Sequence, residues 1–207
     1  SSPRGASGEA ESAWAVRRRF ALPLIAPGLL QGKSGAVVSP MLPIFVREDL
    51  HGSNGAVGLV AAAYSMASLV ASPICGVALR NVPYSVSACL ALCVLVLTAA
   101  ASYETQSVAV LFCVRLVGGA AMSTWNLSRK SYLAAEVPKA MAGRISSTLA
   151  GAQKTAIAVA AVLSGAIAQH VATRSIFLVQ IAFTGTALML LLSHEAPRSE
   201  AGLWTVG

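Results

Sequence analysis

Long apolar runs, separated by short polar loops, are the feature that most limits how this chain can fold. A helix needs about 20 mostly apolar residues to cross the hydrocarbon core of a membrane. Six runs approach or exceed that length, at 20–46, 55–79, 84–102, 107–133, 145–169 and 174–193. They lack the alternation of polar and apolar residues that indicates strands. We therefore predict an all-α fold, a polytopic transmembrane bundle of about six spanning helices.

The composition excludes two other classes of protein. Charged residues make up only 11% of the chain, whereas a soluble domain has about 25% and needs them to cover its surface. The formal net charge of +7 would suggest nucleic acid as a partner. However, the sequence shows no basic and aromatic platform of the kind that binds single strands. We therefore expect membrane lipids, and no nucleic acid, around this protein.

The sequence divides into three parts. Residues 1–19 form a polar and basic tail, residues 20–195 form the six-helix transmembrane domain, and residues 196–207 form a C-terminal tail. The stretch 1–15 is rich in Ser, Ala and Gly, which is typical of a processed organelle precursor. We therefore expect an integral protein of a plastid or mitochondrial membrane.

Lys and Arg residues are divided unequally between the two predicted sides of the membrane. The basic side carries Arg17, Arg18, Arg19, Arg80, Lys139, Arg144 and Arg198. The other side carries Arg47 and Arg174, with three acidic residues nearby. Because loops rich in Lys and Arg stay on the inner side, we expect the basic side to face the cytoplasm, stroma or matrix.

Several cations lie inside the predicted spans, where an ionisable residue is costly and usually functional. Lys33 lies in the first run, Arg115 in the fourth and Lys154 in the fifth. Helical periodicity places Asn126 on the same face as Arg115, together with Arg129. We predict that four residues line a substrate site: Lys33, Arg115, Asn126 and Lys154. For Arg129 and Lys130, near the end of the fourth run, pairing with carbonyls or headgroups is the alternative.

None of the six apolar runs contains an Asp or Glu residue. The cations in these runs therefore lack an acidic partner within the membrane-spanning part of the sequence. The missing counter-charge must come from an anionic solute, an anionic lipid or a carboxylate of another chain.

The sequence does not indicate an enzyme. The four cysteines lie in apolar segments without His or acidic residues at metal-ligand spacing. The three histidines lie near loops, far apart in the sequence, and no nucleophile and base form a recognisable pair. We therefore expect no catalytic residues, no metal and no cofactor.

The order of several motifs resembles the amino-terminal half of a major facilitator superfamily transporter. Residues 115–119, Arg-Leu-Val-Gly-Gly, resemble the Arg-x-x-x-Gly motif of the fourth helix of that family. Further similar segments lie at 40–46, 57–76, 131–138, 143–144 and 151–154. The resemblance covers about residues 20–195 and implies helices around a central cavity, with one half rocking against another.

The resemblance also assigns Gly76, Arg80 and Arg144 to the gating elements and inner loops. Two of these elements depart from the family pattern. The loop that begins at Gly76 lacks the Asp and the second Gly of Gly-x-x-x-Asp-Arg-x-Gly, and Ala160-Ala161 replaces a Gly-Pro pair in the fifth span. A transporter of the family has two halves, and this sequence shows one, without an internal repeat.

Two functions follow from these features. The first is half of a carrier for a small anionic or polar solute, completed by a second six-helix half or by a second copy in a homodimer. The alternative is a transporter-derived structural or accessory subunit of a larger organellar membrane complex, whose cations meet lipid or partner acids. We favour the carrier because family resemblance usually extends to function, although fold similarity alone does not establish it.

Overall fold

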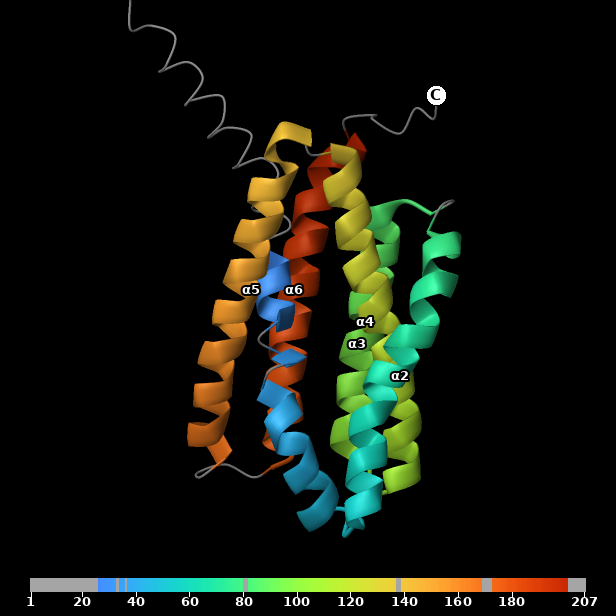
Figure 1. Cartoon of the computed structure of the whole chain (residues 1–207), viewed down its shortest axis with the longest axis vertical. Helices are drawn as coiled ribbons and strands as arrows, with labels where there is room; N and C mark the ends of the chain where they lie inside the picture. Colours follow the sequence, from blue (N-terminus) through green and yellow to red (C-terminus); the bar gives the residue numbers. More distant parts are fainter. Residues whose placement is uncertain are drawn as a thin grey trace, which may run out of the picture.

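The protein is an all-α bundle whose successive helices run in alternating directions (Figure 1). The computed structural model describes the backbone of residues 26–32, 34–35, 37–79, 82–136, 139–168 and 173–200, and this part contains no strand. The first helix is Ala26–Glu48. It is followed by α2 (Asn54–Ala78), α3 (Tyr84–Glu104), α4 (Val108–Glu136), α5 (Lys139–Ala168) and α6 (Ser175–Glu200). The predicted fold class is confirmed.

Five of the described helices are long and apolar enough to cross a membrane: Ala26–Glu48, α2, α3, Val108–Leu133 within α4, and Ser175–Ser193 within α6. The predicted fifth span corresponds to α5, which has 30 residues but also carries Lys139, Arg144, Gln153 and Lys154. Because α5 is not among the five, its crossing of the membrane stays a prediction.

A tight turn joins the first helix to α2. His51 has a left-handed backbone with φ of 50°, and the Gly52 amide donates to the Val46 carbonyl at 2.8 Å. A Cβ at Gly52 would lie 2.8 Å from a Val46 methyl group, so only glycine fits this turn. The Ser53 side chain then accepts from the Ala56 amide and caps α2.

The described ion pair lies close to this turn. Arg174, just before α6, lies with its Nε 3.8 Å from Oδ1 of Asp49. Both side chains are partly exposed, so the pair contributes about 1 kcal/mol or less. It places two residues that the sequence assigns to one side of the membrane at the same end of the bundle.

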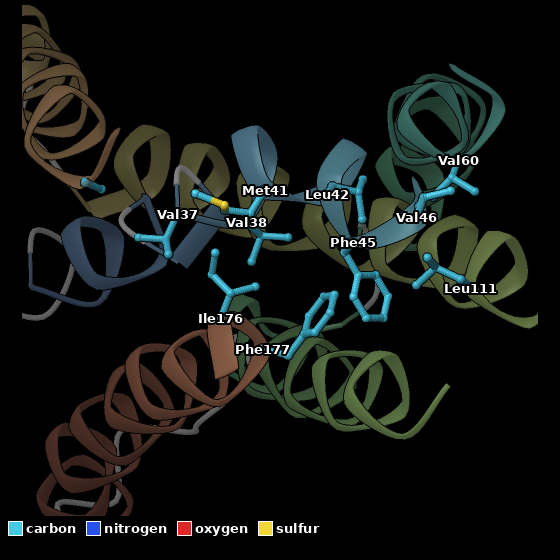
Figure 2. Packing of buried hydrophobic residues seen from close by; sticks show 11 residues of the cluster. Val37, Val38, Met41, Leu42, Phe45, Val46, Val60, Leu111, Ile176 and Phe177 are labelled. Atoms are coloured by element: carbon cyan, nitrogen blue, oxygen red, sulfur yellow. The ribbon is translucent and has the colours of Figure 1, made fainter. Parts of the chain in front are cut away.

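Two apolar clusters lie at different heights in the bundle. In the first cluster, the first helix packs on α6, α2 and α4 (Figure 2). The rings of Phe45 and Phe177 meet edge to face, with centroids 5.1 Å apart. In the second cluster, Leu92 and Leu95 of α3 pack with Trp125 of α4 and Leu191 of α6. These two clusters supply much of the apolar packing, so the residues between them can be polar.

Apolar side chains also cover the outside of α2. Leu69, Val77 and Ile74 are 77%, 68% and 64% exposed. In water such a surface would be unfavourable, because exposing each square ångström of apolar surface to water costs about 25 cal/mol of free energy. Lipid tails remove that cost, so the exposed face suits a helix at the edge of a membrane bundle.

The inner side of α2 packs closely against α4. Hydrogen bonds join Ser72 to Ser123 at 2.8 Å and Cys75 to Thr124 at 3.1 Å. A Cβ at Gly119 would clash with the backbone carbonyl of Tyr64 in α2. The neighbouring Gly118 is different, since a Cβ there would meet Thr98 Oγ1 at an ordinary 3.5 Å. Gly119 therefore sets the distance between α2 and α4.

We predict that Gly119→Ala destabilises the protein and Gly118→Ala does not. The new methyl group at 119 must displace backbone, which costs about 1–3 kcal/mol and lowers Tm by about 2–10 °C. Thermal unfolding of the detergent-solubilised variants, followed by circular dichroism, measures the difference. Equal Tm values for the two variants would contradict the close contact between α2 and α4.

Candidate functional site

A cavity lined by both polar and apolar residues lies between the two apolar clusters. Its volume is about 320 Å³, at the small end of the range of about 300–1,000 Å³ found for ligand pockets. Residues of the first helix, α2, α4, α5 and α6 line it: Gln31, Gly32, Gly35, Val38, Ser39, Tyr64, Arg115, Met122, Gln153, Ile157 and Gln180. We call it the central cavity.

Arg115 of α4 supplies the positive charge of the central cavity. Its guanidinium carbon lies 4.8 Å from the centroid of the Tyr64 ring, a cation–π contact that partly offsets the loss of water. Its Nε is buried and has no hydrogen-bond partner among the described residues. No carboxylate is among the residues that line the cavity. The cation is therefore placed to accept an anion.

A much smaller cavity of about 10 Å³ also borders Arg115. Thr98 and Ser102 of α3 and Gln180 of α6 are among the residues that line it. The volume is enough for about one water molecule, and the polar lining suits one. Arg115 thus has polar surroundings on more than one side, which lowers the cost of keeping it charged at this depth.

Three glutamines add donors and acceptors to the central cavity. Gln31 is 2% exposed, and its Oε1 has no hydrogen-bond partner among the described residues. Its Nε2 lies 3.8 Å from the Met122 sulfur, a weak acceptor. Gln153 and Gln180 complete the set. A buried acceptor without a donor is costly, so Gln31 favours a ligand that brings a hydrogen-bond donor.

A second pocket lies toward the end of α4. Its volume is about 170 Å³, and its lining comes from α4 and α5: Asn126, Arg129, Lys130, Leu133, Ser146, Ala150 and Gln153. Gln153 lines both this pocket and the central cavity. We call it the basic pocket because two of its seven lining residues are cations.

The described residues that were predicted to line one substrate site do not line the same cavity. Arg115 lines the central cavity and Asn126 the basic pocket. Lys154 is exposed and lines neither. Lys33 lies outside the described residues, so its predicted role stays a prediction.

The predicted gating residues are less well described. Gly76 lies near the end of α2, exposed, and a Cβ there would meet nothing within 4 Å. Arg144 lies in α5 with its side chain outside the described part, and Arg80 lies outside the described residues altogether. Their roles in gating stay predictions.

Sequence reasoning passed over the polar uncharged residues of the central cavity. Gln31, Gln153 and Gln180 each fall inside a predicted apolar run, where an amide needs partners as a charge does. That signal was available in the sequence. Tyr64 gave no such signal, because its place beside Arg115 depends on how α2 packs on α4.

The described residues contain no group of three or more His, Cys, Asp or Glu side chains that would hold a metal. The polar groups that converge in the central cavity are a guanidinium, a phenol and amides. This set suits the binding of a solute by hydrogen bonds and charge.

Comparison with known families agrees with the fold. The sequence profile of the Major Facilitator Superfamily matches residues 28–204. The chain belongs to this superfamily. No individually curated protein matches it. As a superfamily member whose described part holds five apolar helices of spanning length, it is an integral membrane protein with a transporter-like role.

Proposed function

We propose that the chain forms half of a carrier for a small anionic or polar solute, which binds in the central cavity beside Arg115. One observation carries this proposal. Arg115 lines a cavity that reaches five helices, and no carboxylate is among its lining residues. A charged residue at the centre of a spanning helix costs about 2.5–3.5 kcal/mol on insertion scales. A bound anion would recover part of that cost.

The chemistry of the central cavity limits the solute. The part of the cavity that this chain encloses, about 320 Å³, is large enough for a small molecule, and an opposite wall would add to it. Arg115 binds the anionic group, and the Gln31 and Gln180 amides are placed to bind hydroxyl or other polar groups. A small organic acid that also carries a hydrogen-bond donor fits these groups best.

A carrier of this superfamily moves solute by rocking one half against another. The described helices supply one wall of such a site, and a second copy or a partner chain would supply the opposite wall. The alternative, an accessory subunit of a larger complex, requires no solute in the central cavity. The two functions therefore differ in whether Arg115 matters for flux.

We predict that neutralising Arg115 strongly lowers the rate of uptake. The protein, extracted in mild detergent and reconstituted in liposomes, is tested with radiolabelled lactate, succinate and phosphate. Arg115→Gln should lower the rate for the transported anion at least tenfold, because a charge-assisted hydrogen bond contributes about 1.5–3 kcal/mol. Arg47→Gln is the matched control, since Arg47 is exposed near the end of the first helix and lines neither pocket.

Equal uptake by the Arg115→Gln variant and the wild type would contradict the proposal. So would a wild-type protein that takes up none of the three anions and co-purifies in fixed proportion with many unrelated subunits. That second outcome would favour the accessory subunit.

The Gln31 oxygen, which has no hydrogen-bond partner among the described residues, gives a second prediction. A hydroxy acid such as lactate should bind more tightly than propionate, which lacks the hydroxyl group, by about threefold to tenfold. Gln31→Leu should remove this preference and leave propionate binding nearly unchanged. Isothermal titration of both acids into both proteins measures it. A preference that survives Gln31→Leu would show that another group binds the hydroxyl.

A further inference from the structure

The basic pocket lies apart from the central cavity on the same helix. Arg129 follows Arg115 by 14 positions in α4, which corresponds to about 21 Å along the helix axis. The residues that line the pocket come from α4 and α5, near the end of α4 that leads into α5. Arg129 therefore lies at a different depth of the bundle from Arg115, although Gln153 lines both cavities.

Arg129 is buried in a fixed position in the wall of the basic pocket. The residue is 7% exposed, and its guanidinium carbon lies 5.6 Å from the centroid of the Trp125 ring. On another side it meets the first helix, where a Cβ at Gly28 would lie 2.9 Å from Nη2. An aromatic ring and a glycine thus hold the guanidinium in place, and holding it costs less entropy when a ligand binds.

No carboxylate among the described residues forms an ion pair with Arg129. Its Nε is buried without a hydrogen bond among the described residues. The side chains that line the pocket include no carboxylate, and Lys130 adds a second positive charge. Burying an unpaired cation is costly, so this pocket favours an anionic ligand.

We propose that Arg129 and Lys130 form a second anion site, which binds a phosphate group. A guanidinium is planar and donates two parallel hydrogen bonds to phosphate oxygens, and an ammonium adds a mobile charge. Asn126 and Ser146, also in the lining, supply an amide and a hydroxyl group as further donors. A phosphate group carries more charge and more acceptor oxygens than a carboxylate, and it matches this set better.

Gln153 connects this second site to the central cavity, because it lines both. The proposal does not depend on transport, since a phosphate group can bind at Arg129 whether or not Arg115 binds a solute. The phosphate group can belong to a soluble anion or to a lipid headgroup, and both present the same chemistry to the two cations.

The test for a soluble anion uses inorganic phosphate and the full chain in a maltoside detergent. Isothermal titration is carried out in an Arg115→Gln background, so that the central cavity does not contribute. Adding Arg129→Gln should weaken phosphate binding at least tenfold, the effect of losing about 1.4 kcal/mol or more. Lys130→Gln should weaken it about twofold to fivefold, because Lys130 is exposed.

The test for a lipid headgroup uses native mass spectrometry of the wild type with phosphatidylglycerol. Bound lipid that is lost in Arg129→Gln, without binding of inorganic phosphate, would identify the headgroup as the ligand. The Lys130→Gln variant controls for misfolding. Because Lys130 is exposed, its substitution should leave the packing unchanged, so weaker binding in this variant reports the loss of its charge. Arg47→Gln, at the far end of the first helix, should leave both kinds of binding unchanged.

The proposal is overturned if neither inorganic phosphate nor phosphatidylglycerol binds. It is also overturned if binding is unaffected by both Arg129→Gln and Lys130→Gln, or falls equally in Arg47→Gln. These results leave the proposed carrier function untouched, since uptake depends on Arg115 and is measured separately.

Discussion

Arg115 carries a positive charge into a membrane-spanning helix, and no carboxylate is among the residues that line its cavity. A bundle of purely apolar contacts could not hold it. The chain instead packs two apolar clusters at different heights and leaves polar residues between them. On α6, for example, Gln180 lies between Phe177 of the first cluster and Ala187 of the second. The two clusters pack the helices together on either side of the central cavity, so polar residues can line the cavity.

A close helix contact brings the aromatic partner to Arg115. Gly119 has no side chain, so the backbone of α2 at Tyr64 reaches the surface of α4. The Tyr64 ring then lies 4.8 Å from the Arg115 guanidinium. The Arg-x-x-x-Gly pattern thus has a physical meaning here, since the arginine supplies the charge and the glycine one turn later admits the helix that stabilises it. The same logic recurs at Arg129, where Trp125 supplies the ring and Gly28 of the first helix admits the guanidinium.

Sequence reasoning predicted the helices well, because an apolar run of spanning length has few other ways to fold in lipid. It also placed Arg115 and Asn126 on one face of α4. It could not predict that the two residues line different pockets, because periodicity gives the direction of a side chain and not the neighbour that it meets. The same limit applies to Lys154, which is exposed although the adjacent Gln153 lines both pockets. Gln31 and Gln180 line one cavity because of how the first helix and α6 are arranged in the bundle, which no local pattern encodes.

The central claim is that Arg115 binds the solute directly, and the most direct measurement is the side-chain nitrogen spectrum of Arg115. The protein is labelled with nitrogen-15 in nanodiscs, the Nε resonance is assigned with Arg115→Lys, and lactate, succinate or phosphate is added in increasing amounts. If Arg115 binds the solute, this resonance shifts and saturates along the same binding curve that calorimetry gives for the bound anion. An anion that binds while the Arg115 resonance stays unchanged would contradict direct binding, and would show that the solute is held elsewhere in the protein.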